Sequence, residues 1–424
     1  MIQHLLLLSL CLSATWVHAV EMTDIKRQQV MQALQAGTDP NVKALSDNDV
    51  LVLKAVMALD EGRTEQALGV LHQPSVKKDP LLVMLEAEAY RRAAIESVEQ
   101  AGEYAKGFIR QKALLQEADL SMGLREANVR LSLLSDKLDG VSGFPLDLLQ
   151  VDEKIYSVFL VDKARSRLFV YARNGNGQLE RVADEYVVTG AKQGDKQEEG
   201  DARTPNGVYR FVEKLQGHGL EARYGPVAYP IDYPNALDAL HRKDGSGIWL
   251  HGFAEGVGRR PPRDTKGCFA LPNSRLLAMA EYIQLGRSWV VVGKNFVFND
   301  EPLRQEVALS VKQSIEAWRK DWSARDTPAY LSHYHPHFRS GSSDLMAWTR
   351  YKTRVNASKS FIDVALAKLT LVHDPNMWPE GDVVVAEFDQ TYRSDNYQDI
   401  TRKRLYLARK STESDWKILL EETL

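Results

Sequence analysis

The chain has 424 residues, of which 44% are hydrophobic and 26% are charged, and its formal net charge is -3. This length exceeds one ordinary hydrophobic core, so we expect a globular protein of two or three domains. No basic block stands out in the sequence, which argues against nucleic acid as a substrate.

Residues 1–19 resemble a secretory signal peptide. The segment from Leu5 to Leu12 is an apolar core, and Val17 and Ala19 are small residues where a signal peptidase reads the chain. A buried first helix is the alternative interpretation. No later run approaches the roughly 20 apolar residues that span a bilayer. We therefore expect a periplasmic protein that is exported and has no membrane span.

Cys268 is the one cysteine expected in the mature protein, because Cys11 lies inside the signal peptide. Lipidation of Cys11 is a lesser alternative, since its neighbours Leu10 and Leu12 make a poor lipoprotein cleavage site. A single cysteine cannot form an internal disulfide, and an odd thiol in an oxidising compartment suggests a reactive role.

Residues 20–145 are predicted to form a helical domain. Apolar residues follow helical spacing from Leu51 to Leu59, from Thr64 to Val70 and from Leu81 to Tyr90, and residues 113–138 extend the pattern. The offset between Leu51 and Leu82 is near the period of tetratricopeptide-type repeats. Two interpretations stay open: a surface for a homodimer or protein partner, or a scaffold that binds nothing.

Residues 150–297 are predicted to be β-rich, after a boundary marked by Gly140, Gly143 and Pro145. The strand patterns cover residues 156–162, 167–171, 180–189, 208–212, 248–250 and 289–292, and residues 163–166 form a hairpin turn between the first two. The apolar run 248–250 leads into His251, which we therefore expect at the end of a strand.

His251 and Cys268 are the candidate catalytic pair. A nearby imidazole can take the proton of a thiol and hold the resulting ion pair. Gly252 follows the histidine and Gly267 precedes the cysteine, so the backbone can approach both sites without side-chain bulk. A buried cysteine acting as a small hydrophobe is the alternative.

Three motifs in order resemble the L,D-transpeptidase catalytic domain, also called YkuD, over roughly residues 155–295. The first is Gly200-Asp201-Ala202-Arg203-Thr204-Pro205-Asn206-Gly207-Val208-Tyr209, the second is Tyr233-Pro234-Asn235, and the third is His251-Gly252 followed by Thr265-Lys266-Gly267-Cys268 and Asn273. Lys266 stands where the family usually has histidine, and Ala270 where arginine is common. The K-G-C form is similar to a subgroup of L,D-carboxypeptidases that set cell shape and to enzymes that detach lipoprotein from peptidoglycan.

The resemblance implies a cysteine enzyme acting on peptidoglycan stem peptides. Cys268 would attack the carbonyl between meso-diaminopimelate and D-alanine, with His251 as the base and Gly252 holding the imidazole. Water as the acceptor gives L,D-carboxypeptidase activity and an amine gives transpeptidation, and the sequence leaves the acceptor open. Backbone N–H groups near Gly267 and Cys268 would meet the oxyanion. The residues expected to contact substrate are Gly267, Lys266, Thr265, Arg263, Tyr233 and Asn235, and no cofactor or metal is implied.

Residues 303–424 resemble nuclear transport factor 2-like domains. An amphipathic helix over 309–322 contains Trp318 and Trp322, the spaced aromatic residues Tyr330 and Tyr334 come after it, and strand patterns follow at 361–371, 382–393, 401–410 and 416–423. The resemblance implies a cone with an apolar pocket. His333, His335 and His337 alternate, but no matching carboxylate cluster follows, so a loop explains them as well as a metal site does.

The predicted fold class is therefore multidomain α+β: an N-terminal helical, repeat-like domain, a central β-rich L,D-transpeptidase-like domain and a C-terminal α+β cone. A non-catalytic peptidoglycan-binding scaffold is the alternative function from a different class.

Overall fold

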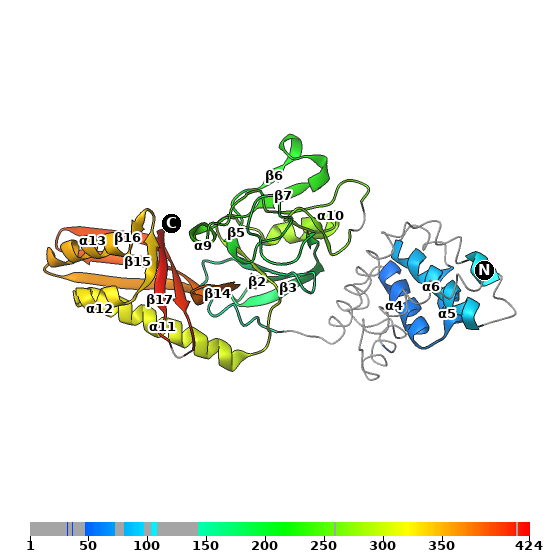
Figure 1. Ribbon diagram of the computed structural model, residues 1–424, viewed down its shortest axis with the longest axis horizontal. Coiled ribbons are helices and arrows are strands. Elements are labelled where there is room, and N and C mark those ends of the chain that lie inside the picture. Colours follow the sequence, from blue (N-terminus) through cyan, green and yellow to red (C-terminus); the bar gives the residue numbers. More distant parts are fainter. Residues whose placement is uncertain are drawn as a thin grey trace. The chain divides into compact units, whose positions relative to one another are not determined.

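The computed structural model describes residues 47–72, 80–96, 103–107, 143–257, 260–412 and 414–424, together with Gln32 and Ala36 (Figure 1). The chain divides into two compact units, one of residues 1–141 and 260–262 and the other of residues 142–259 and 263–424. The predicted signal peptide and the helices expected over 113–138 lie outside the described residues.

The N-terminal unit contains the helices α4 (Asp47–Asp60), α5 (Thr64–Leu71) and α6 (Pro80–Glu96). Their apolar faces form one core, which includes the buried residues Val52, Leu59, Leu68 and Leu85. Helical structure is thus confirmed for the described part of this region, whereas the repeat and the partner surface stay predictions.

A five-stranded sheet forms one layer of the central region, in the order β3-β2-β1-β11-β5. Its strands are β1 (Ser157–Asp162), β2 (Arg167–Arg173), β3 (Leu179–Tyr186), β5 (Gly207–Arg210) and β11 (Ser288–Gly293). β1 pairs with β2 as the predicted hairpin, and β1 is parallel to β11. β1 and β11 are buried along their whole length, which explains why both are continuous apolar runs.

A second sheet has the order β10-β8-β7-β6 and carries the candidate catalytic pair. Its strands are β6 (Leu215–Gln216), β7 (Val227–Pro230), β8 (Trp249–His251) and β10 (Phe269–Ala270), while β4 (Thr189–Gly190) and β9 (Arg263–Thr265) form a separate parallel pair. Short helices α9 (Ala236–Leu240) and α10 (Asn273–Met279) and the single turns η2 (Gly217–Gly219), η3 (Ala222–Tyr224) and η4 (Ala280–Tyr282) connect these strands. The two sheets share a core that includes Phe159, Phe211, Leu250 and Phe269.

The C-terminal region packs three helices against a six-stranded sheet of order β13-β12-β17-β16-β15-β14, and the long helix α11 runs beside this sheet (Figure 1). The helices are α11 (Glu301–Ser323), α12 (Thr327–Ser332) and α13 (Leu345–Ala357); the strands are β12 (Tyr334–Ser340), β13 (Ser343–Asp344), β14 (Ile362–Trp378), β15 (Gly381–Ser394), β16 (Tyr397–Arg409) and β17 (Lys417–Thr423). Trp318 and Trp322 lie one helical turn apart and are both buried, so the aromatic spacing seen in the sequence marks the core-facing stripe of α11.

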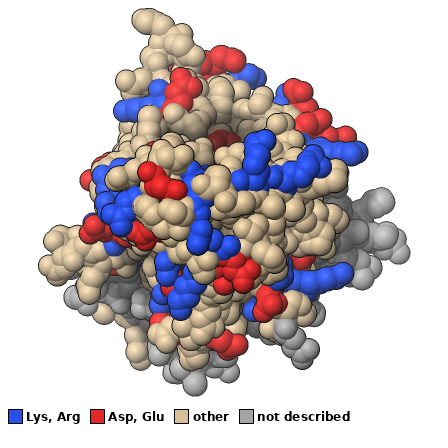
Figure 2. All heavy atoms as spheres, turned by 90° about the vertical axis from the view of Figure 1, so that its left-hand side faces the viewer, with Lys and Arg blue, Asp and Glu red and all other residues tan. Residues whose placement is uncertain are grey.

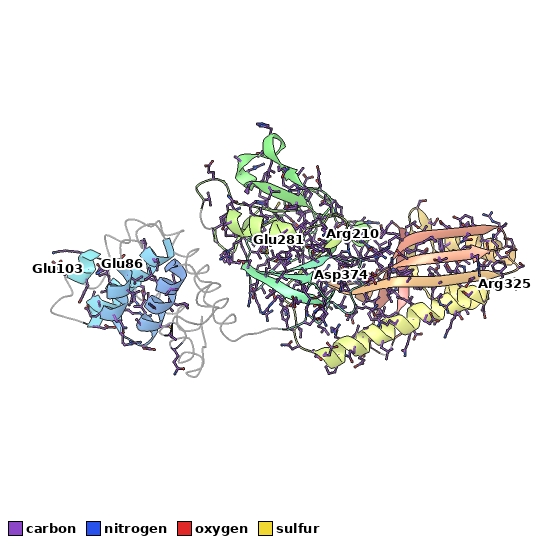
Figure 3. All side chains as sticks on the ribbon, turned by 180° about the vertical axis from the view of Figure 1, so that it is seen from behind. Glu86, Glu103, Arg210, Glu281, Arg325 and Asp374 are labelled. Atoms are coloured by element: carbon purple, nitrogen blue, oxygen red, sulfur yellow. The ribbon has the colours of Figure 1, made fainter. Side chains whose placement is uncertain are left out.

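β14 continues to Trp378, whereas the sequence pattern predicted its end at Leu371. The alternation of apolar residues breaks near Pro375, and the strand passes this point with a shift in its register to β15. The extended end of the β14–β15 hairpin packs against the central region, where Val372 and Trp378 share a core with Trp289. Figure 3 labels Arg210 and Asp374 where these two regions meet.

His335 and His337 lie on β12, in a strand and not in the loop that was the alternative interpretation. His333 ends α12 and its Nε2 lies 2.7 Å from Asp321 Oδ2. The described residues contain no group of three or more His, Cys, Asp or Glu side chains that could hold a metal ion. Among the described helices, none is long and apolar enough to cross a membrane.

Candidate active site

Cys268 and His251 lie at a pair of neighbouring parallel strands. His251 is the last residue of β8, Cys268 immediately precedes β10, and the register pairs Ala270 with His251 and Phe269 with Leu250. Cys268 therefore lies two residues before the strand partner of His251.

The His251 imidazole is held from the backbone. Its Nδ1 lies 2.6 Å from the carbonyl oxygen of Gly252, and the side chain is buried with 4% of its surface exposed. The edge of its ring meets the ring of Tyr224 at 5.0 Å between centroids. Because a carbonyl only accepts hydrogen bonds, Nδ1 carries the hydrogen in the neutral ring, and Nε2 is the nitrogen that can accept a proton.

Gly252 has to be glycine for packing reasons. A Cβ at this position would lie 2.2 Å from Asn273 Oδ1, which accepts the hydrogen bond of Phe253 N at 2.7 Å. Gly252 N in turn donates to the carbonyl oxygen of Tyr224 at 2.8 Å. These contacts fix the turn after β8, and with it the carbonyl that orients His251.

The backbone of Cys268 is held by two threonine hydroxyl groups. Thr265 Oγ1 donates to the carbonyl oxygen of Cys268 at 2.6 Å, and Thr204 Oγ1 approaches the same oxygen at 3.4 Å. The Cys268 side chain is half-buried, and its Sγ lies 3.4 Å from the carbonyl oxygen of Gly247. The threonine of the Thr-Pro motif thus helps to hold the backbone of Cys268.

Gly267 adopts a positive φ of 132°, and a Cβ there would lie 2.9 Å from the carbonyl oxygen of Arg203. Its N–H donates to Thr265 Oγ1 at 3.2 Å. In this state the Gly267 amide is therefore used inside the turn and does not point into the cleft, in contrast to the expected contribution to an oxyanion site.

The other expected substrate-binding residues fall into two groups. Lys266 and Arg263 are exposed beside the cysteine turn and on β9, whereas Thr265 is buried behind Cys268. Tyr233 and Asn235 are buried and engaged within the fold: the Tyr233 hydroxyl donates to Asp244 O at 3.0 Å, and Asn235 forms the N-terminal capping box of α9 with Asp238. Sequence reasoning did not single out Tyr224 or Gly247, because nothing in the local pattern indicates their contacts.

A cavity of about 640 Å³ lies in the C-terminal region. The resemblance implied an apolar pocket, but the wall mixes the aromatic residues Trp322, Trp348 and Tyr392 with Lys352 and Glu421. Lys352 is buried, its Nζ lies 4.2 Å from the ring centroid of Trp322, and burial lowers its pKa to about 8. Figure 2 shows the end of the molecule at which this region lies, where basic and acidic side chains are interspersed.

Comparison with known families identifies both regions of the second unit. Residues 156–292 match the model of the L,D-transpeptidase catalytic domain. The central region is an L,D-transpeptidase catalytic domain. Residues 310–422 match the NTF2-like C-terminal domain of Cds6, so the C-terminal region is an NTF2-like domain.

Two solved structures are similar to about two thirds of this chain. Bd1075 from Bdellovibrio bacteriovorus is 27% identical, with a TM-score of 0.57, over 66% of this chain and 98% of that chain. The helical cell shape determining protein Pgp2 from Campylobacter jejuni is 26% identical, with a TM-score of 0.55, over 66% of this chain and 93% of that chain. No curated protein matches the chain.

Proposed function

We propose that this protein is a periplasmic cysteine enzyme that cleaves the L,D bond of peptidoglycan tetrapeptide stems. The observation that carries the proposal is the placement of His251 at the end of β8 and of Cys268 immediately before the parallel strand β10, with His251 Nδ1 bound to Gly252 O. This arrangement leaves Nε2 to serve the thiol. Similarity to Pgp2, a helical cell shape determining protein, favours a role in cell shape.

The reaction runs through a thioester. His251 Nε2 takes the proton of Cys268, and the sulfur attacks the carbonyl that joins meso-diaminopimelate to D-alanine. The C–N bond breaks, the proton passes from His251 to the leaving amine, and D-alanine departs. Water then attacks the thioester carbon and gives its proton to His251, which releases a tripeptide stem and restores the thiol.

The tetrahedral oxyanion needs backbone donors worth roughly 3–4 kcal/mol each. Since Gly267 N donates to Thr265 Oγ1, the Cys268 N–H is the better candidate, and Gly267 would contribute only after the turn rearranges. Gly267 and Cys268 form one turn, so a small rotation of one peptide plane suffices.

Water is the acceptor that we favour, which makes the enzyme an L,D-carboxypeptidase. Lys266, exposed next to the cysteine turn, replaces the histidine common in crosslinking relatives and is also positioned to meet a substrate carboxylate. Detachment of a lipoprotein from peptidoglycan uses the same acylation chemistry and is the second candidate.

Incubation with defined tetrapeptide muropeptides, followed by mass spectrometry, tests the proposal. A tripeptide product from the parent protein supports the assignment, a crosslinked dimer as the main product overturns the choice of water, and a folded but inert protein supports the scaffold alternative. Cys268→Ala serves as the blank for each product.

A further inference from the structure

A cationic cavity of about 370 Å³ lies in the catalytic domain, and neither Cys268 nor His251 lines it. Four of its lining residues are positively charged and none is acidic; they are Lys163, Lys192, Arg263 and Lys294. A cavity of this size accommodates a group of amino-acid dimensions. Its charge selects for an anion.

The four cations are not neutralised by salt bridges to residues that the structure describes. Lys192, Arg263 and Lys294 are exposed and take part in none. Arg263 lies against the uncharged side-chain amide of Gln193, whose oxygen accepts from the guanidinium when the amide is flipped. A guanidinium and two ammonium groups without a carboxylate partner among the described residues attract a carboxylate, which arginine can bind in bidentate fashion.

Lys163 forms the inner wall and is bonded only to carbonyl groups. Its Nζ donates to Gly194 O at 2.7 Å and to Thr204 O at 2.6 Å. Burial lowers the pKa of Lys163 to about 8, and the nearby carboxylates that oppose this effect, Asp195 and Asp201, are each already paired with another lysine. An additional negative charge in the cavity would therefore stabilise the ammonium form.

The cavity lies next to the threonine hydroxyl groups that contact the carbonyl oxygen of Cys268. Thr204 lines the cavity, accepts from Gly190 N at 2.8 Å and approaches the Cys268 carbonyl oxygen at 3.4 Å. Arg263 lies two residues before Thr265, the second hydroxyl on that oxygen, and β9 pairs with β4 at both positions. The cationic cavity therefore borders the segments that hold the backbone of Cys268.

We propose that this cavity is a subsite for a free carboxylate of the stem peptide, an inference that rests on the proposed function. Stem peptides offer three such groups near the cleaved bond: the carboxylate of the terminal D-alanine, the carboxylate at the D-centre of diaminopimelate, and the free carboxylate of the residue that precedes diaminopimelate. All three have the same chemistry, and amidation of one at a time distinguishes them.

The test compares the parent with the double variant Lys192→Gln/Lys294→Gln. We expect KM for the tetrapeptide muropeptide to rise about tenfold with kcat unchanged, because each exposed cation contributes about 0.5–1 kcal/mol to an ionic contact. The control is Lys312→Gln/Lys410→Gln, which removes the same charge from exposed positions in the NTF2-like domain. Its KM should equal that of the parent.

The substrate arms identify the carboxylate. For the parent, amidation of one of the three groups should raise KM by a similar factor, and the double variant should lose this discrimination. Equal KM values for parent and double variant, or an equal rise in the Lys312→Gln/Lys410→Gln control, would overturn the inference.

Binding separates this inference from the proposed activity. Calorimetry with Cys268→Ala protein and the same muropeptides measures Kd without turnover, so an inert parent defeats the proposed function alone. If Kd for the free and amidated muropeptides is the same, in the presence and absence of Lys192 and Lys294, the subsite assignment fails whatever the activity.

Discussion

Two regions are stabilised in opposite ways: the cleft around Cys268 and His251, and the junction between the L,D-transpeptidase domain and the NTF2-like domain. In the cleft, the reacting side chains are held through backbone carbonyls and glycine turns, as Gly252 and Gly267 show. At the junction, charged and aromatic side chains hold one another: Lys243 Nζ lies 2.7 Å from Asp195, 2.9 Å from Asp238 and 4.2 Å from the ring centroid of Trp378.

This difference predicts whether a mutation changes mainly the activity or mainly the stability of the protein. A side chain oriented by backbone groups can be removed without leaving a buried charge unpaired, so variants in the cleft should report chemistry. Removal of one member of the junction network leaves its buried partners without a hydrogen bond or counter-charge, which is strongly destabilising. Variants at the junction should therefore report stability.

Cys268→Ala should have the largest effect on activity and almost none on folding. We expect turnover of tetrapeptide stems to fall below about one percent of the parent rate, since no other group supplies the thioester, while thermal unfolding stays within a few degrees. Product analysis and a melting curve on the same preparation measure both. Residual turnover above that level would remove Cys268 from its role as nucleophile.

His251→Ala should slow the reaction of the Cys268 thiol at neutral pH. Loss of a positioned base costs about 10²–10⁴-fold in turnover. The measurement is the rate of alkylation by iodoacetamide against pH, with Cys268→Ala as the blank. An alkylation profile identical to that of the parent would show that His251 is not the base.

Trp378→Ala should destabilise the protein by about 3–5 kcal/mol, because a large buried side chain leaves a cavity. Its ring also stacks on His241 at 4.5 Å between centroids, and it lies beneath Lys243. The neighbouring Met377 is 84% exposed, so Met377→Ala is the matched control. Equal free energies of unfolding for the two variants, from urea titration, would contradict this view of the junction.

Lys352→Met should stabilise the protein by about 1–3 kcal/mol at pH 7, since the folded state lowers the pKa of a buried ammonium to about 8. Between pH 8 and the usual value near 10.5 the unfolded chain binds more protons, so the parent gains stability as pH rises through this window. The variant should lack this gain. A parent curve flat from pH 8 to 10, matching that of the variant, would contradict the prediction.

Lys266→His should produce the smallest change, confined to the choice of acceptor. Lys266 is exposed beside the cysteine turn, so we expect the ratio of tripeptide to crosslinked dimer to shift more than the acylation rate does. Both products come from one reaction and are measured together. An unchanged ratio would mean that the Lys266 side chain has no part in handling the acceptor.

The same contrast explains how much the sequence could predict. The residues of the cleft lie in short motifs, so Cys268, His251, Gly252 and Thr204 could be located from local patterns, as could the strand end at His251. The junction depends on pairs far apart in the chain: Asn376 donates to Asp195 at 3.0 Å across 181 positions. No local periodicity indicates such a contact, and for this reason the predicted strand ended at Leu371.

The sequence patterns were equally unable to predict which polar side chains are buried. Tyr233 and Asn235 sit in a motif that the family resemblance linked to substrate, yet their hydrogen bonds serve Asp244 and the start of α9. The motif alone does not show these contacts, which only the fold reveals.

The most direct test of the central claim is intact-mass spectrometry of the protein during its reaction with a tetrapeptide muropeptide. The account predicts a transient mass increase equal to the stem without its D-alanine, mapped by proteolysis to Cys268, and no such increase in Cys268→Ala. Turnover with no such adduct under rapid acid quenching, or an adduct mapped to another residue, would contradict it.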